Sequence, residues 1–349
     1  MARHPTMRTH RRPLLEMALA LFPLLALPAT DVAAQGRGGR GGAEITDTAR
    51  AARLFVSDRA EDHPQANFER QIESKAATDS IFAARAAGIM DYRKITYRSR
   101  VGDMDIPAYV YQPLEKRGPR GHAAMIWVHG GVHGNWDQNY WPFIEEAVER
   151  GYVVIAPEYR GSTGYGADHY NAIDYGGYIT LLSTMREQGP FAAAVAMVPV
   201  TNLIFRLSYK GPSYQRSFST QSRIQGLPFE QREIYVDRSP YYHVHKLNTP
   251  LLVHVATNDT DVNYEEASML VWSLRAQKPD LAETKIYVDP PPGRAGRGHT
   301  FNRRVDTQTL ERMDTPEQRD SWNRVWTFFE LHLRPYEAIP ERAAPRSVR

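Results

Sequence analysis

The chain has 349 residues, 42% of them hydrophobic, and contains no cysteine. Its 43 Lys and Arg against 40 Asp and Glu give a net charge of +3, which argues against a nucleic-acid-binding protein and against a protein that binds membranes through basic surfaces. The lack of cysteine excludes disulfide scaffolds, thiolate metal sites and a cysteine nucleophile.

The first 34 residues are typical of a secretory signal peptide. A basic start is followed by an apolar run at residues 17–27 and by small residues that end at Ala34. The apolar run is interrupted by Pro23 and is too short to span about 30 Å of hydrocarbon. We therefore expect cleavage after Ala34, export to the periplasm or the medium, and no membrane span in the mature protein.

The rest of the chain divides by composition. Residues 35–44 are rich in Gly and Arg and predict a disordered linker, because such residues bury little surface. Residues 45–91 predict a charged helical extension that ends near Gly88. Residues 92–335 have an α/β pattern, and residues 336–349 predict a loose tail rich in Pro and Arg.

Apolar runs and helical periodicity define the elements of the α/β region. Strands are expected at residues 92–100, 104–113, 123–128, 152–157, 192–200, 250–256 and 284–288, and helices at 143–150, 177–188, 265–277 and 316–333. The first two strands should form a hairpin, and the later alternation predicts a mostly parallel sheet with helices on both faces. The aromatic residues 201–245 are expected to form an irregular, lid-like insertion beside a cleft.

Two segments follow predicted strands in the manner of a hydrolase site. The sequence His129-Gly130-Gly131 follows the strand at 123–128, where glycines let backbone N–H groups approach an oxyanion, although an ordinary turn is the alternative. Asp259 and His299 each follow a later strand, and this order of acid and base fits the α/β-hydrolase series Ser…Asp…His. A turn aspartate and a surface histidine are the alternatives for these two residues.

Other histidines do not indicate a metal site. His129 and His133 lie four residues apart, but in a Gly-rich loop rather than on one helical face. His243 and His245 resemble a metal pair, yet no third ligand is placed near them by the sequence. We expect no metal and no cofactor.

Residues 158–166, EYRGSTGYG, resemble the YRGSTGYG loop of the prolyl oligopeptidase family of serine peptidases. Further segments are similar in kind and order: residues 127–131 (WVHGG), 238–240 (RSP), 249–252 (TPLL), the turn at Asp259, and Gly298-His299. The resemblance covers roughly residues 95–335. It implies an α/β-hydrolase fold and an enzyme that hydrolyses small peptides or esters through an acyl-enzyme. It also implies that Asp259 is the triad acid, His299 the base, and Gly131 or Val132 an oxyanion donor. Many relatives carry an N-terminal β-propeller, for which residues 35–90 are too short.

The chain departs from this family at the nucleophile. The family places its serine in G-x-S-x-G-G, between the YRGSTGYG loop and the next strand, and this chain has no G-x-S-x-G. Only residues 167–175 separate that loop from Gly176, whereas a parallel strand needs a crossover of about a dozen residues besides the strand itself. We therefore expect the nucleophile strand to be missing, and the strands at 123–128 and 192–200 to pair directly.

Three residues are weak candidates to replace the serine. Asp174 stands at the serine position if Gly176 is the last glycine of the elbow, Ser162 lies in the YRGSTGYG loop, and Ser183 lies two turns into a predicted helix. Three interpretations stay open: a serine-type peptidase by family, a non-enzymatic pseudoenzyme or truncated allele, and an Asp-nucleophile hydrolase that uses Asp174. The sequence indicates neither a preferred substrate side chain nor an oligomeric state.

Overall fold

The computed structural model describes most of the α/β region and the helix before it. The described residues are 65–100, 103–115, 121–131, 133–171, 179–186, 189–220, 224–293 and 297–333. The predicted signal peptide, linker and tail, and the predicted extension before Gln65, lie outside these residues. No helix among the described residues combines the length and the apolar character needed to cross a bilayer.

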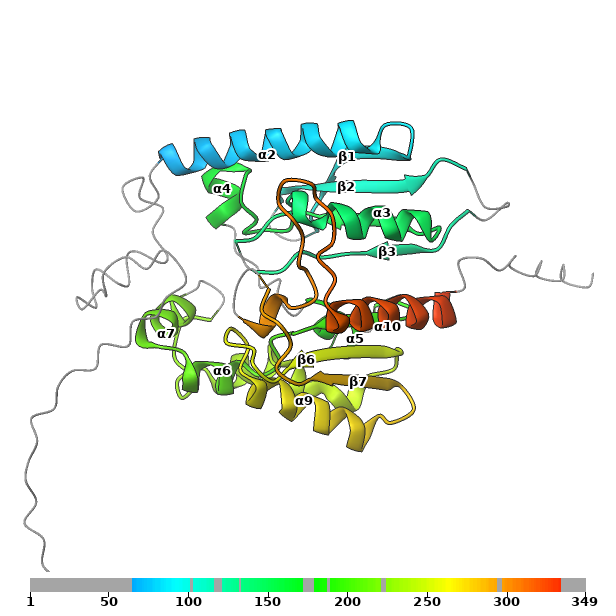
Figure 1. Cartoon of the computed structure of the whole chain (residues 1–349). Helices are drawn as coiled ribbons and strands as arrows, with labels where there is room; N and C mark the ends of the chain where they lie inside the picture. The colour runs from blue at the N-terminus through cyan, green and yellow to red at the C-terminus, as the bar shows by residue number, and fades with distance from the viewer. Residues whose placement is uncertain are drawn as a thin grey trace, which may run out of the picture. The chain divides into compact units, whose positions relative to one another are not determined.

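The described part of the N-terminal extension is a single helix, α2 (Gln65–Ala86). It ends before Gly88, whose φ of +76° is the left-handed conformation that glycine adopts without strain. Phe82 and Ala86 are buried in the main core cluster. The extension is therefore helical here, as predicted, and it packs as an integral part of the fold (Figure 1).

The first sheet has four strands in the order β1-β2-β4-β3. Its strands are β1 (Met90–Arg98), β2 (Asp105–Pro113), β3 (Ala124–Ile126) and β4 (Val153–Pro157). β1 and β2 form the predicted antiparallel hairpin, β2 pairs antiparallel with β4, and β3 pairs parallel with β4. This sheet is therefore mixed, because it contains both antiparallel and parallel pairs of strands.

The second sheet is parallel and has three strands in the order β5-β6-β7. They are β5 (Ala194–Met197), β6 (Leu251–Ala256) and β7 (Ala282–Tyr287). The prediction that the strands at 123–128 and 192–200 pair directly is wrong, because β3 and β5 belong to separate sheets. Side chains fill the boundary instead: Met125 of β3 and Leu252 of β6 share one cluster, against which Val195 of β5 packs.

The helices follow the predicted pattern in the α/β region and exceed it in the insertion. They are α3 (Trp141–Glu149), α4 (Gly166–Asn171), α5 (Ile179–Met185), α6 (Leu203–Tyr209), α7 (Pro212–Ser219), α8 (Arg232–Asp237), α9 (Tyr264–Gln277) and α10 (Pro316–Leu333), with short 3₁₀ helices at Gln138–Tyr140, Pro240–Lys246 and Gly298–Thr300. Residues 201–245, predicted to be irregular, are largely helical. Asn202 caps α6 by accepting hydrogen bonds from two backbone N–H groups, and Pro212 begins α7.

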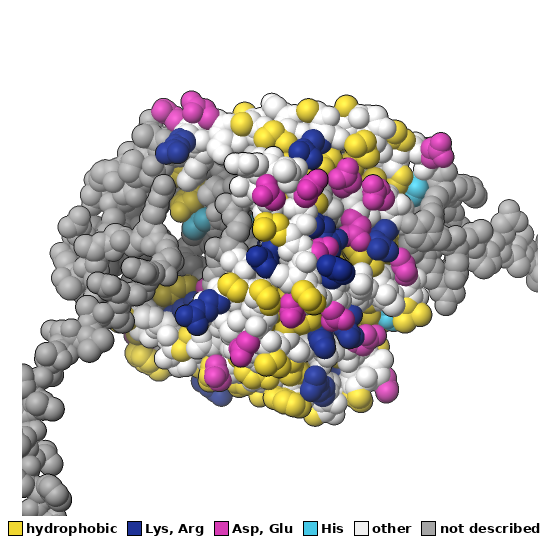
Figure 2. Space-filling view, in the orientation of Figure 1, with side chains coloured by type: hydrophobic (Ala, Val, Ile, Leu, Met, Phe, Trp, Pro, Cys, Tyr) yellow, Lys and Arg dark blue, Asp and Glu magenta, His cyan; other side chains and the backbone are white. Residues whose placement is uncertain are grey.

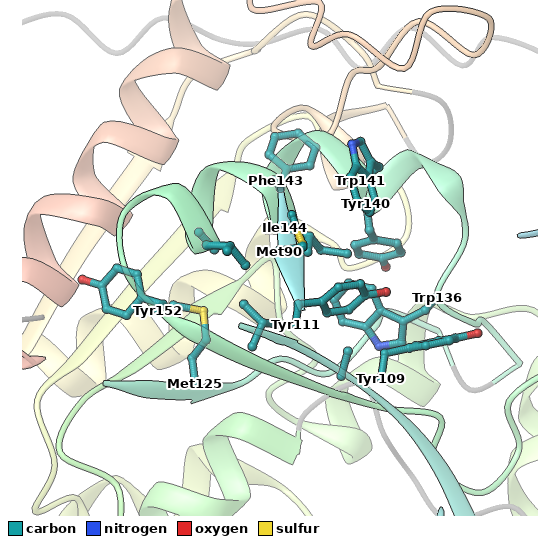
Figure 3. Close-up of a cluster of buried hydrophobic side chains, with 14 of the residues drawn as sticks. Met90, Tyr109, Tyr111, Met125, Trp136, Tyr140, Trp141, Phe143, Ile144 and Tyr152 are labelled. Carbon is teal, nitrogen blue, oxygen red and sulfur yellow. The ribbon is translucent and has the colours of Figure 1, made fainter. Parts of the chain in front are cut away.

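The main core is aromatic and joins the first sheet to α2, α3 and α10. Figure 3 shows part of it, where Trp136 and Tyr140 precede α3 and lie near Tyr109 and Tyr111 of β2. The faces of β6 belong to different clusters: Leu252 joins the main core, whereas Leu251 joins the cluster that includes α5 and α9. Helices therefore cover both faces of the second sheet, as predicted.

The first sheet loses burial toward its free edge. Three side chains lie in register on one face: Val110 of β2 is buried, Ile155 of β4 is half-buried, and Ile126 of β3 is 57% exposed. No strand pairs with the other edge of β3 or of β5 among the described residues. The surface in Figure 2 intersperses charges of both signs, in keeping with the small net charge.

Candidate active site

The turn after β6 holds a buried carboxylate. Asp259 is 6% exposed, and its Oδ1 accepts hydrogen bonds from the backbone N–H groups of Asp261 at 2.8 Å and Val262 at 2.9 Å. Its Oδ2 lies 2.9 Å from Nδ1 of His299. The structure thus brings Asp259 and His299 together, although 40 residues separate them in the chain. A buried carboxylate on Nδ1 fixes the orientation of an imidazole and leaves Nε2 for proton transfer.

A glycine places His299 beside this carboxylate. The N–H of Gly298 donates to the carbonyl of Asn258 at 3.3 Å. The backbones of Arg297 and Asp259 form an isolated antiparallel β-bridge. A Cβ on Gly298 would lie 2.2 Å from Oδ1 of Asn258 and 3.0 Å from the backbone N of Asp259. Only glycine lets the two loops approach so closely.

A second carboxylate faces the other side of the imidazole. Oδ2 of Asp261 lies 3.5 Å from Nε2 of His299, while Oδ1 of Asp261 pairs with Lys210 at 3.0 Å and with Arg206 at 3.5 Å. Burial opposes ionisation of Asp261, but the charges of His299, Arg206 and Lys210 outweigh it and lower the pKa of this carboxyl. Because Arg206 lies on α6, the insertion at 201–245 contacts the turn that bears Asp259.

The loop at residues 129–134 is locked to the YRGSTGYG loop. The hydroxyl of Tyr159 lies 2.9 Å from the carbonyl oxygen of His129 and 2.5 Å from that of Gly131, and the N–H of Thr163 donates to the carbonyl of Gly134 at 3.0 Å. Gly131 has a φ of +74°, and its N–H has no partner among the described residues. Within the described part of the chain, the Gly131 N–H is therefore available as a donor. Val132, the other predicted donor, lies outside the described residues.

The same loop reaches the segment that bears His299 through one hydroxyl. The hydroxyl of Tyr140 accepts a hydrogen bond from the N–H of Gly130 at 3.3 Å and another from Nη1 of Arg303 at 2.8 Å. Arg303 lies four residues after His299. The glycine loop and the His299 segment are therefore neighbours, although β3 and β7, which precede them, belong to separate sheets.

Ser162 has the wrong hydrogen bonds for a nucleophile. It is fully buried, and its hydroxyl donates to the carbonyl of Tyr159 at 2.5 Å. Its Oγ lies 2.8 Å from Nε2 of His129, so it accepts from that ring rather than donating to it. Glu158 approaches the same Nε2 at 3.4 Å, whereas the acid of a triad holds Nδ1. These residues form a buried structural network.

A cation from the N-terminal helix completes this network. Nζ of Lys75 on α2 hydrogen-bonds to Glu158 and to the carbonyl of Trp136, and both charged side chains are buried. Burial lowers the pKa of the Lys75 amine, against the opposing charge of Glu158. Burial opposes ionisation of Glu158, but the hydrogen bond from His129 and the charge of Lys75 lower the pKa of its carboxyl. The network ties α2 to the loops around the candidate site.

The structure does not bring Ser183 to His299. Ser183 lies on α5, and no hydrogen bond joins its hydroxyl to a histidine among the described residues. Asp174 lies outside the described residues. Nε2 of His243 donates a hydrogen bond to the carbonyl of Asp237 at 2.7 Å, and no cluster in the described part of the chain could hold a metal ion.

Sequence reasoning missed three residues of this region. Asp261 was visible as the second acid of Asn258-Asp259-Thr260-Asp261, but its place on the far side of the imidazole depends on the turn geometry. Lys75 and Arg303 carried no sequence signal, because their partners lie 83 and 163 residues away.

Comparison with known proteins identifies a family domain and several distant relatives. Residues 173–310 match the prolyl oligopeptidase family. The uncharacterized peptidase YuxL of Bacillus subtilis is 25% identical over 276 residues, which cover 69% of this chain and 39% of that protein. Dipeptidyl aminopeptidase BIII of Pseudoxanthomonas mexicana is 26% identical over 190 residues, covering 44% of this chain and 28% of that protein. The chain thus spans well under half the length of these relatives.

Solved structures show the same fold. An acylaminoacyl peptidase of Pyrococcus horikoshii superposes with a TM-score of 0.55 at 16% identity, covering 76% of this chain and 45% of that one. An acylaminoacyl peptidase in complex with Z-Gly-Gly-Phe-chloromethyl ketone gives a TM-score of 0.56 at 17% identity, covering 75% of this chain and 45% of that one. At such identities the likeness shows the α/β-hydrolase fold alone.

Proposed function

The chain carries a domain of the prolyl oligopeptidase family with an α/β-hydrolase fold, and we propose that it is a peptidase remnant that binds peptides or esters but forms no acyl-enzyme. In this proposal, Asp259 and His299 are the acid and the base of a serine peptidase, which the chain has kept. Its nucleophile is lost together with the strand that would carry it. The family alone would predict an active serine-type hydrolase. The loss of the nucleophile is proposed for this chain only.

The contact at Nε2 of His299 carries the proposal. In a serine peptidase that nitrogen takes the proton of the nucleophile, so a hydroxyl lies within hydrogen-bond reach of it. Here the neighbour of Nε2 is the carboxylate of Asp261 at 3.5 Å, and no Ser or Thr hydroxyl bonds to His299 among the described residues. A carboxylate at this position accepts a hydrogen bond but has no proton to give when it is ionised.

Two sheet edges that pair with no described strand support the loss of a strand. β3 and β5 end separate sheets, and chain order leaves only residues 172–178 between α4 and α5. Seven residues are too few for a strand, an elbow and the crossover that a parallel strand needs. Ile126 on β3 is 57% exposed, as expected if a neighbouring element that normally covers it is missing.

A peptide is the substrate class that the relatives suggest. The curated relatives include a dipeptidyl aminopeptidase and an uncharacterized peptidase, and these names describe those proteins only.

We also propose that residues 1–34 direct export and are removed, so that the mature protein begins at Gln35. N-terminal sequencing of protein from intact cells tests this, and a chain that still begins near Met1 would contradict it.

Labelling with a fluorophosphonate tests the loss of the nucleophile. The mature chain should show no labelling and no measurable hydrolysis of peptide or ester substrates, while an active serine hydrolase labelled in parallel serves as the positive control. Serine proteases without a triad member retain only about 10³–10⁴-fold catalysis over water, and this chain also lacks the N–H that follows the serine as an oxyanion donor. Stoichiometric labelling that disappears in His299→Ala would overturn the proposal, and mass spectrometry would then locate the serine.

A further inference from the structure

A hollow borders the candidate active site. Its volume is about 290 Å³, and it is lined by Asp137, Asn139, Tyr140, Thr300 and Arg303. Thr300 directly follows His299, and the hydroxyl of Tyr140 accepts a hydrogen bond from the N–H of Gly130 in the glycine loop. The hollow therefore adjoins both the base and the loop that precedes the candidate oxyanion donor.

The hollow contains a cation without an anionic partner. Arg303 is half-buried, and it donates through Nη1 to the hydroxyl of Tyr140 at 2.8 Å. No carboxylate of the described residues lies within ion-pair distance of its guanidinium, whereas Arg206 pairs with Asp261 and Arg312 pairs with Glu146. A guanidinium has five N–H donors in a planar fork, so most of the donors of Arg303 are uncommitted.

A second donor in the hollow is the hydroxyl of Tyr140. Its oxygen accepts hydrogen bonds from Gly130 and Arg303, and its own proton has no acceptor among the described residues. One oxygen of the acid in the hollow is engaged in its own turn: Oδ1 of Asp137 accepts from the backbone N–H of Asn139 at 2.9 Å and from its side-chain amide at 2.7 Å. Two donors therefore face the hollow next to an acid that caps its own turn.

We propose that this hollow binds the α-carboxylate of a short peptide, held by the guanidinium of Arg303 and the hydroxyl proton of Tyr140. A planar fork beside a hydroxyl matches the geometry of a carboxylate. The inference rests on the proposed function, because it names the peptide class that the site accepts: peptides with a free C-terminus close to the bond that faces His299. An amidated peptide keeps one acceptor oxygen but lacks the charge and the second oxygen, so it cannot accept from both donors through two oxygens and should bind far more weakly.

The test observes Arg303 directly and needs no turnover. The mature chain is labelled with ¹⁵N-arginine, and the Nε–H signal that disappears in Arg303→Lys is assigned to Arg303. Addition of N-acetylglycine should move this signal saturably, whereas N-acetylglycinamide, which differs only in the charged group, should not. Equal shifts with both compounds, or no shift with N-acetylglycine, would overturn the proposal.

Matched variants separate the hollow from general charge. Arg303→Gln should weaken N-acetylglycine binding about ten- to a hundredfold, the usual effect of a lost charge-assisted hydrogen bond. Arg304→Gln removes the same charge one residue further on, outside the lining of the hollow, and should leave binding unchanged. Equal weakening by both variants would contradict the proposal. Fluorophosphonate labelling of the same protein would refute the loss of the nucleophile and leave this result intact.

Discussion

The carboxylate of Asp261 lies 3.5 Å from Nε2 of His299, on the opposite side of the ring from Asp259, which lies 2.9 Å from Nδ1. The imidazole therefore contacts carboxylates at both nitrogens. Asp259 is held by two backbone N–H groups, and Asp261 is held by Lys210 and Arg206. Both acids are fixed by the fold around them, so the imidazole of His299 is oriented whether or not a nucleophile is present.

Gly298→Ala should disrupt this pair. The new Cβ would lie 2.2 Å from Oδ1 of Asn258 and 2.8 Å from Cβ of Ala256, so the His299 segment must move away from β6. We expect a loss of about 1–3 kcal/mol of unfolding free energy, as for other overpacked sites, and loss of the low-field proton signal of the His299–Asp259 hydrogen bond. Gly211→Ala, where a Cβ meets nothing within 4 Å, is the control and should leave that proton signal in place.

Lys75→Met should destabilise the chain by about 3–5 kcal/mol, because it leaves the buried carboxylate of Glu158 without its cation. The double variant Lys75→Met, Glu158→Gln removes both charges and should be more stable than the single variant. Urea unfolding of the three proteins measures the difference. A double variant less stable than Lys75→Met would contradict this account of the pair.

The stability should fall between pH 7 and pH 5 because of His254. This residue of β6 is fully buried, and burial, helped by the charge of Arg324, lowers its pKa to about 3 despite the opposing charge of Asp320. Between that value and the unfolded pKa of about 6.5, only the unfolded chain takes up the proton, so stability is lost as pH falls. The expected loss is roughly 2 kcal/mol between pH 7 and pH 5.

His254→Gln should flatten this pH dependence. Some slope remains in the variant, because burial also lowers the pKa of His169. Urea unfolding at pH 7 and at pH 5 gives the comparison, and equal slopes in the wild type and the variant would exclude His254 as the cause.

Ile126→Lys should reduce aggregation without weakening the fold. Ile126 is 57% exposed on a strand whose second edge pairs with no other strand in the described part of the chain, and such edges pair with other chains unless a charge blocks them. Light scattering on heating should show a later onset, with unfolding free energy changed by less than about 0.5 kcal/mol. Met125→Lys, at a neighbouring position that is 8% exposed, is the contrast and should destabilise strongly. An unchanged onset of scattering in Ile126→Lys would argue against this edge as the site of association.

Local patterns predicted much of the fold. The closing helix α10 has the predicted bounds, 316–333, because a stripe of large apolar residues repeats along it. The strand at 250–256 is a continuous apolar run and becomes β6, buried along its whole length. The insertion at 201–245 is largely helical and not irregular as predicted: Asn202 caps α6, and Leu203 and Leu207 of that helix are buried in a cluster of their own.

The site was predictable only in part. The pairing of Asp259 with His299 follows from strand ends that meet at one edge of a sheet, which the sequence shows. The burial of Ser162 and the contact between Asp261 and His299 depend on how loops pack against each other, which no local pattern encodes. The direct pairing of β3 with β5 failed as a prediction because side chains of the main core lie at that boundary.

The loss of a central strand should leave the chain marginally stable. A central strand buries about six apolar side chains at about 1.5–3 kcal/mol each, or about 10 kcal/mol in total, which rivals the whole stability of a domain. The chain without it should therefore be marginal, with a thermal transition below about 65 °C, the upper end of the range for mesophilic domains. A cooperative transition above that temperature would contradict the missing strand.

The inserted segment should consist of a crossover helix, an apolar strand and G-x-S-x-G-G, placed before Tyr178. It would pair with the free edges of β3 and β5 and place a serine hydroxyl at Nε2 of His299, where Asp261 now lies. We expect a higher melting temperature, burial of Ile126, and fluorophosphonate labelling that is lost in His299→Ala. The same insertion with alanine in place of the serine should raise the melting temperature equally but give no labelling. A stabilised protein whose labelling persists in His299→Ala would show that His299 is not the base.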